Sequence, residues 1–186
     1  MSARFRFHSP LDGLNVIERL PIKDQRGFLE RMFCADTFRE IGVAKPIVQI
    51  NRTLTVRKAT VRGMHFQFPP HAETKIICCL RGEVFDVAVD LRAGSPTFLH
   101  WHGEILSGGN ARMLCIPEGF AHGFQTLSDD CEMLYFHTAA YASGAEGGVS
   151  PIDTRVGIMW PLPLGELSER DAGHPPLTQN YAGITI

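Results

Sequence analysis

Val84-Phe-Asp-Val-Ala-Val-Asp-Leu91 is the stretch of sequence that decides the fold. Apolar side chains occupy odd- and even-numbered positions alike, which is typical of a strand covered on both faces. The turn signal Arg81-Gly82 precedes it, and a second apolar run, Ile76-Ile-Cys-Cys-Leu80, lies before that turn. A glycine between two strand-like runs is a hairpin signal. We therefore expect residues 75–91 to form a hairpin whose second strand is covered by another sheet.

Further strand-like segments continue on both sides of this stretch, separated by glycine- and proline-containing turns. About ten short strands without long intervening helices favour a sandwich or a barrel over a parallel βαβ arrangement. We predict an all-β fold, the double-stranded β-helix (jelly-roll) barrel of the cupins, in a single domain over residues 1–186. The expected strands are residues 14–20, 28–33, 47–56, 59–68, 75–80, 84–91, 97–106, 112–116, 122–127 and 132–138.

Two short peripheral helices complete the predicted fold. In the first, Asp36 is the expected N-cap, residues 37–41 form the body and Gly42 ends the helix. The second is a single turn in Leu167-Ser-Glu-Arg-Asp171, where the Ser168 hydroxyl caps the first turn.

Composition narrows the function classes. The formal net charge is −2, so there is no basic footprint for nucleic acid, and an anionic ligand needs a local cluster of Arg and Lys. Apolar residues make up 44% and charged residues 20% of the chain, which argues against disorder. The five cysteines form no C-x-x-C motif and indicate reduced, buried thiols. Met1-Ser-Ala-Arg-Phe-Arg-Phe-His8 has no signal-peptide core, and no apolar run is long enough to span a bilayer. We expect a cytoplasmic protein with no membrane partner.

One histidine and one lysine stand out by their placement. His65 lies in the strand-like Arg62-Gly-Met-His-Phe-Gln67, and Lys75 opens the next apolar strand. A base and a fixed positive charge entering a β-rich core are costly to bury and useful for proton abstraction. Two plainer explanations stay open: a hydrogen-bonded core histidine, and a lysine that extends its amine to solvent.

Several blocks of the chain resemble the dTDP-4-dehydrorhamnose 3,5-epimerase family. They occur in the family's order and spacing over roughly residues 10–175, and this many blocks in register is a far more specific signal than any one of them. The blocks are Asp24-Gln-Arg-Gly-Phe-Leu-Glu30, Arg62-Gly-Met-His-Phe-Gln67, residues 81–92, Ser95-Pro-Thr-Phe98, residues 116–124 and Leu167-Ser-Glu-Arg-Asp171.

The resemblance implies an isomerase that inverts C3 and C5 of a dTDP-4-keto-6-deoxyhexose in dTDP-rhamnose or other deoxysugar biosynthesis, without metal or cofactor. Both carbons are alpha to the C4 ketone, so a base, an oxyanion partner and an acid are needed. By the resemblance, His65 is the base and Asp171 its carboxylate partner. Lys75 faces the C4 oxyanion, Tyr135 is the general acid, and His122 contacts the sugar or the carbonyl.

The nucleotide is expected to be held by a separate set of residues. Arg62 resembles the pyrophosphate contact, where a guanidinium can bind two oxygens at once. Gln49 and Asn51 match polar ligand contacts, and Tyr141 matches an aromatic residue that stacks on the base.

The resemblance also implies a homodimer with an exchanged N-terminal strand. Arg26, Phe28 and Glu30 share one strand face by period two, and in the family this strand reaches the nucleotide in the partner subunit's site. A sheet edge left unpaired in a monomer is a liability that such an exchange covers.

Three departures from the family pattern leave the substrate open. Ile50 replaces an acidic residue, Phe136 replaces a lysine, and Pro151 stands at or near the place of a tryptophan. The alternatives are a C3-only epimerase on another nucleotide-linked keto sugar, a ketoisomerase, a non-catalytic sugar-nucleotide-binding cupin, and a metal-dependent cupin. The metal-dependent alternative would draw its ligands from His65, His71, Glu73 and His122.

Overall fold

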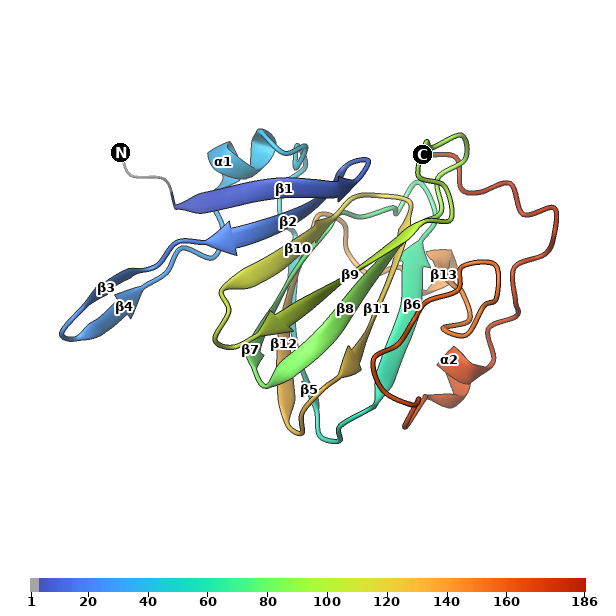
Figure 1. Cartoon of the computed structure of the whole chain (residues 1–186). Coiled ribbons are helices and arrows are strands. Elements are labelled where there is room, and N and C mark those ends of the chain that lie inside the picture. Colours follow the sequence, from blue (N-terminus) through green and yellow to red (C-terminus); the bar gives the residue numbers. More distant parts are fainter. Residues whose placement is uncertain (1–3) are drawn as a thin grey trace.

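The computed structural model describes residues 4–186 and shows two antiparallel sheets packed face to face (Figure 1). The six-stranded sheet has the order β1-β2-β10-β7-β12-β5, and the five-stranded sheet has the order β13-β6-β11-β8-β9. This architecture confirms the predicted all-β jelly-roll. The first sheet contains β1 (Phe5–Leu11), β2 (Leu14–Arg19), β10 (Arg112–Ile116), β7 (Lys75–Arg81), β12 (Cys131–His137) and β5 (Gln49–Thr55). The second contains β13 (Glu146–Gly148), β6 (Val61–Gln67), β11 (Phe120–Thr126), β8 (Glu83–Asp90) and β9 (Trp101–Ser107).

Strand β8 is buried on both faces, as its sequence predicts. Val84 and Ala88 pack into the core between the two sheets. Val87 and Val89 face the other way, into a second apolar cluster that the C-terminal part of the chain helps to cover. One face is therefore covered by a sheet and the other by loop and tail segments, which is how an antiparallel strand comes to carry apolar side chains on both faces.

The predicted hairpin over residues 75–91 is wrong. Strand β7 pairs with β10 and β12 in one sheet, whereas β8 pairs with β9 and β11 in the other. Gly82, at φ +76°, turns the chain from one sheet to the other. A Cβ at this position would lie 2.7 Å from Ser128 Oγ, so the tight packing of the corner requires glycine.

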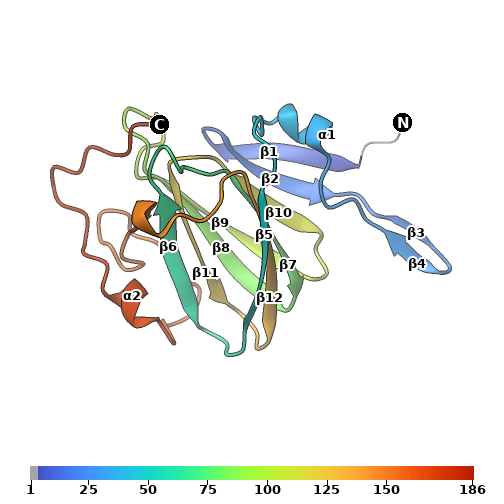
Figure 2. The ribbon, with the colours of Figure 1, turned by 180° about the vertical axis from the view of Figure 1, so that it is seen from behind.

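The N-terminal part of the chain differs most from the expected elements. β1 was not expected, and the predicted strand 28–33 is reduced to β4 (Gly27–Leu29), paired with β3 (Ile22–Asp24). This β3–β4 hairpin projects away from the two sheets as an arm (Figures 1 and 2). Its apolar residues Phe28 and Leu29 are 70% and 71% exposed.

The short helices lie at the periphery, as predicted, but the first begins earlier than expected. α1 (Ala35–Arg39) has Cys34 at its N-cap, and Asp36 lies inside the first turn, where it pairs with Arg39 at 3.0 Å. α2 (Glu169–Ala172) is confirmed as a single turn capped by Ser168. A 3-10 turn, η1 (Ser143–Ala145), precedes β13.

Residues 97–99 lie in a turn instead of the start of a strand, and β9 begins only at Trp101. The Thr97 hydroxyl donates to Asp90 Oδ2 at 2.7 Å, which holds this segment against the end of β8. All five cysteines are free thiols, and all but Cys34 are buried, in line with the prediction. Within residues 4–186, neither helix has the length or apolar character needed to cross a bilayer.

Candidate active site

A cavity of about 800 Å³ lies between the two sheets and is lined from both of them. β6 and β11 contribute from the five-stranded sheet; β5, β7 and β12 contribute from the six-stranded sheet; and α2 contributes from the C-terminal part of the chain. The cavity brings together eight of the twelve site residues predicted from the sequence. These are Asn51, Arg62, His65, Lys75, His122, Tyr135, Tyr141 and Asp171.

A bulge in β6 brings Arg62 and His65 to the same cavity, although residues three apart on a regular strand face opposite ways. His65 pairs with His122 and Arg62 pairs with Phe124, so three steps along β6 match two along β11. Gly63 lies in this bulge at φ +127°. A Cβ on Gly63 would lie 2.5 Å from Gly123 Cα, so only glycine allows the two strands to approach this closely.

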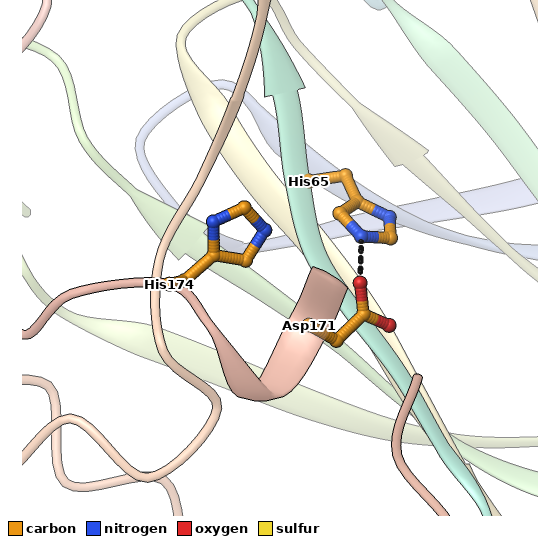
Figure 3. A group of neighbouring side chains, drawn as sticks. All are labelled: His65, Asp171 and His174. Carbon is orange, nitrogen blue, oxygen red and sulfur yellow. Dashed lines mark hydrogen bonds and ion pairs between the residues drawn. The ribbon is translucent and has the colours of Figure 1, made fainter. Parts of the chain in front are cut away.

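His65 and Asp171 form a hydrogen-bonded pair, with His65 Nε2 2.7 Å from Asp171 Oδ1 (Figure 3). The other carboxylate oxygen accepts from the Gly63 backbone N–H at 3.1 Å, and the Asp171 N–H itself donates to Ser168 Oγ. Burial alone would raise the pKa of Asp171, but the hydrogen bonds from His65 and Gly63 outweigh it and lower the pKa to about 2. Asp171 therefore stays ionised and anchors the imidazole ring.

The contacts around His65 determine which ring nitrogen carries the proton. Asp171 is ionised and can only accept, so His65 Nε2 carries the hydrogen that points toward it. Arg170 Nη2 lies 3.0 Å from the same nitrogen. Because Nε2 is protonated, it has no lone pair with which to accept a hydrogen bond from this guanidinium. Nδ1 is thus the ring's basic atom, and in Figure 3 it points away from Asp171. This tautomer is the one that a general base needs.

His122 is held by a second carboxylate, Asp86, on β8. His122 Nε2 lies 2.9 Å from Asp86 Oδ2, and Asp86 is fully buried. Burial is the main influence on both groups, lowering the pKa of His122 and raising the pKa of Asp86, although each is opposed by the attraction between the two. His122 is therefore a neutral, fixed hydrogen-bonding group in the cavity wall.

Tyr135, on β12 of the six-stranded sheet, has two histidine rings near it. Its ring centroid lies 6.1 Å from that of His122 and 6.1 Å from that of His137. Burial raises the pKa of Tyr135 well above its usual value. The phenol therefore keeps its proton at neutral pH and can act as a donor.

Lys75 reaches across the cavity from β7. Its Nζ donates to the His65 backbone carbonyl at 3.1 Å and lies 3.3 Å from Glu73 Oε1. The lysine is buried, so it does not extend to solvent as the plainer explanation required. The cavity thus holds one buried ammonium beside the proposed base.

The remaining predicted nucleotide contacts lie outside this cavity. Gln49 Oε1 accepts from the Tyr141 backbone N–H at 3.0 Å, so Gln49 supports a cavity residue from behind. Arg26 and Phe28 lie on the β3–β4 arm, away from the cavity of their own chain. Glu30 is paired with Arg19 at 3.2 Å near the base of the arm.

The departures from the family pattern do not line the cavity. Phe136 packs against Phe33 on the outer face of the six-stranded sheet, with ring centroids 6.3 Å apart. Ile50 is exposed on β5, and the Pro151 carbonyl accepts from Trp160 Nε1 at 2.8 Å. The three departures therefore lie outside the wall of the cavity.

Sequence reasoning missed several residues of the site, among them Asp86, His137, Glu146 and Arg170. Arg170 lies beside Asp171 in the sequence and forms an ion pair with Glu146 at 3.0 Å. Alternation could have indicated His137, since it is two residues from Tyr135 on the same strand. No local signal connects Asp86 with His122, because they lie on different strands.

Two of the residues considered as metal ligands, Glu73 and His122, are engaged elsewhere. Glu73 contacts Lys75 and His137, and His122 is bonded to Asp86. Among the described residues, His65, Asp171 and His174 bring their ligand atoms within 4.8 Å of one another (Figure 3). The Arg170 guanidinium, 3.0 Å from His65 Nε2, places a positive charge beside this group, which disfavours a bound cation.

Proteins of known name have sequences similar to this chain. The chain is 46% identical to the dTDP-4-dehydrorhamnose 3,5-epimerase of Salmonella typhimurium over 166 residues, 88% of this chain and 90% of that protein. It is 40% identical to a dTDP-4-dehydrorhamnose 3-epimerase of Streptomyces niveus over 149 residues, 80% of this chain and 72% of that protein.

A solved structure of similar fold contains a bound keto sugar nucleotide. This is the dTDP-6-deoxy-D-glucose-3,5-epimerase of Legionella pneumophila in complex with dTDP-4-keto-L-rhamnose. It superimposes with a TM-score of 0.86 at 39% sequence identity, covering 91% of each chain. The sequence profile described as dTDP-4-dehydrorhamnose 3,5-epimerase matches residues 8–179. With the profile spanning nearly the whole chain, the protein belongs to the dTDP-4-dehydrorhamnose 3,5-epimerase family.

Proposed function

We propose that the protein is an epimerase that inverts C3 and C5 of a dTDP-4-keto-6-deoxyhexose, in the biosynthesis of dTDP-rhamnose or a related deoxysugar. One observation carries this proposal: His65 and Tyr135 lie on facing sheets across a single cavity. Inversion requires a proton to leave one face of the sugar ring and another to arrive on the opposite face. A base and an acid on opposite walls meet that requirement.

The chemistry follows from the groups present. His65 Nδ1 takes the proton from the carbon next to the C4 ketone, and the electron pair of the broken C–H bond moves onto the C4 oxygen to give an enolate. The Lys75 ammonium stabilises the developing negative charge, and His122 offers a neutral polar contact beside it. Tyr135 then delivers its proton to the opposite face of the same carbon, and the C4 carbonyl forms again.

Asp171 and Arg62 have supporting roles in this proposal. Asp171 holds the His65 tautomer and stabilises the imidazolium that forms when the proton is taken up. Arg62 also lines the cavity. Its guanidinium suits the pyrophosphate of the nucleotide, a part of the ligand that does not react. Asn51 and Tyr141 offer polar and aromatic contacts for the rest of the ligand.

Proton NMR in D₂O on dTDP-4-keto-6-deoxyglucose tests the proposal. Deuterium at C3 and C5 together with an inverted product is the expected result. Deuterium at C3 alone would make the protein a C3-only epimerase, an alternative supported by the Streptomyces niveus relative. Nucleotide binding without deuterium exchange would contradict catalysis and leave a binding module.

We propose further that the protein forms a homodimer through the β3–β4 arm. The arm exposes Phe28 and Leu29, and β5, an edge strand of the six-stranded sheet, exposes Ile50 and Leu54. Apolar residues on an arm and on an open edge are costly in a monomer and are buried if two chains exchange arms. In that arrangement Arg26 and Phe28 can reach the partner subunit's nucleotide.

Sedimentation equilibrium tests the dimer. A Phe28→Ser/Leu29→Ser double variant should be monomeric and bind dTDP more weakly. Met159→Ser, which removes another exposed apolar side chain away from the arm, should remain dimeric.

Five free thiols suit a reducing compartment, which supports a cytoplasmic location.

A further inference from the structure

A buried carboxylate, Glu73, links two cavity residues that the proposed chemistry does not connect. Glu73 Oε1 lies 3.3 Å from Lys75 Nζ, and Oε2 lies 2.8 Å from His137 Nδ1. The side chains of Glu73, Lys75 and His137 are 8%, 10% and 11% exposed. All three line the cavity.

The strand register explains why a carboxylate is needed here. Lys75 and His137 are direct partners on β7 and β12, so their side chains share one face of the sheet. The Lys75 ammonium is buried on this face, and a buried charge is costly unless an opposite charge pairs with it. Burial alone would raise the pKa of Glu73, but the hydrogen bond from His137 and the charge of Lys75 outweigh it and lower the pKa. The group between the two bases is therefore an ionised carboxylate.

This carboxylate also fixes the ring of His137. An ionised carboxylate only accepts, so His137 Nδ1 carries the hydrogen and donates it to Glu73. The other ring nitrogen, Nε2, lies 3.4 Å from Asn51 Nδ2 and accepts from that amide. With both nitrogens engaged, the ring cannot rotate without breaking a hydrogen bond.

The fixed ring of His137 lies beside the ring of Tyr135. The two residues are two apart on β12 and face the same way, and their rings lie 6.1 Å apart at an interplanar angle of 16°. The ring of His122, on the facing sheet, lies 6.1 Å from the Tyr135 ring at an interplanar angle of 71°. His137 is thus the neighbouring ring through which Glu73 can influence the orientation of the phenol.

We propose that Glu73 is a positioning residue that holds two reacting groups at once: the Lys75 ammonium directly, and the Tyr135 phenol through the ring of His137. The inference rests on the proposed epimerase function. Lys75 acts when the proton leaves, whereas Tyr135 acts when the new proton arrives. Loss of Glu73 therefore impairs both steps, whereas loss of the His137 ring impairs only the second.

Two measurements on the full-length protein separate these steps. The rate of deuterium uptake from D₂O into the keto sugar reports proton removal, and the ratio of inverted product to exchanged sugar reports delivery of the new proton. Calorimetric titration with dTDP checks that the nucleotide site is intact. Thermal unfolding checks that each variant is folded.

Glu73→Gln keeps the size of the side chain and removes its charge. We expect exchange to fall by about 100-fold, the cost of misplacing a reacting group by about 1 Å. KM should change far less than kcat.

In the His137→Gln variant, the new amide can still donate to Glu73 but the ring is lost. Exchange should therefore stay close to wild-type while the product-to-exchange ratio falls. His137→Phe keeps a ring against Tyr135 and should preserve more of that ratio.

Glu132→Gln is the matched control, since it removes a carboxylate paired with Arg52 at the opposite end of β12. It should behave as wild-type in both measurements. Wild-type exchange in Glu73→Gln would overturn the inference, and a wild-type ratio in His137→Gln would overturn its second half. If Glu73→Gln does not fold, Glu73→Asp retains the charge on a shorter stem, and unchanged kcat in that variant overturns the positioning role. Absence of exchange in the wild-type protein would instead contradict the proposed function.

Discussion

His65 and His122 stand directly opposite each other on β6 and β11, and each is bonded through Nε2 to its own carboxylate. The two pairs differ in burial: the His65 side chain is 24% exposed and the His122 side chain 7%. The pKa of Asp171 is lowered, whereas burial raises the pKa of Asp86 and lowers that of His122. Two histidines in matching positions are thus suited to different tasks, one to accept a proton and the other to remain neutral.

Replacing His65 by Ala removes the proposed base. Solvent exchange should fall by at least about 100-fold, because a positioned general base contributes on the order of 10²–10⁴ to the rate. Proton NMR in D₂O measures this, and calorimetry with dTDP should still detect binding. Unchanged exchange in this variant would remove His65 as the base.

Replacing Tyr135 by Phe removes the proton donor but keeps the ring. Deuterium uptake should persist, because His65 can remove a proton and return a deuteron on the same face. The inverted product should be greatly reduced, which NMR of the sugar ring protons measures. A normal yield of product would make Tyr135 a structural aromatic residue.

Replacing Lys75 by Ala removes the cation near the enolate oxygen. The activation barrier should rise by about 2–4 kcal/mol, as when one donor is removed from an oxyanion hole. Steady-state kcat measures this, and dTDP affinity should be little changed. A kcat within a few-fold of wild-type would show that the enolate does not depend on this ammonium.

Asp171 should make stability depend on pH. Its pKa is lowered from 3.8 to about 2 in the folded protein, so it stabilises the fold fully above about pH 4, by about 2 kcal/mol. That contribution is lost as the pH falls through about 2. Urea unfolding of wild-type and Asp171→Asn should therefore differ most at neutral pH, and the difference should shrink below pH 4. A pH-independent difference would contradict the lowered pKa.

Replacing Gly63 by Ala should destabilise the fold by about 3 kcal/mol or more, because the new Cβ would clash with Gly123 and the backbone has φ +127°. Gly109→Ala is the matched control, since no atom lies within 4 Å of its Cβ position and its φ is not in the left-handed region. Chemical denaturation measures both. Equal stability of the two variants would show that the β6 bulge tolerates a side chain.

The existence of most strands could be predicted from the sequence, but not which sheet each one joins. The runs before and after Gly82 look like a hairpin because apolar periodicity reports burial and not the partner strand. Both runs are buried, and in the fold they belong to different sheets. The β1 strand was missed because its alternation is weak: of its seven residues only Phe5 is buried.

The residues of the candidate site could be predicted largely from motif resemblance. The geometry of the site could not be predicted from the sequence. Strand parity alone would place Arg62 and His65 on opposite faces, and only the bulge at Gly63 unites them. The link between Glu73, Lys75 and His137 depends on the pairing of β7 with β12. Such pairings join segments far apart in the chain, which local patterns do not encode.

The attachment of α2 to β6 has a consequence for how activity arises during synthesis. Asp171 follows His65 by 106 positions, and it comes from the C-terminal tail rather than from the sandwich. The same tail also contributes Val156 and Ile184 to the apolar cluster that covers one face of β8, so the tail folds together with the sandwich rather than after it. A nascent chain therefore gains its packed sheets and its anchored imidazole at the same stage, and in the proposed mechanism a polypeptide clipped before Val156 would lose stability and activity together.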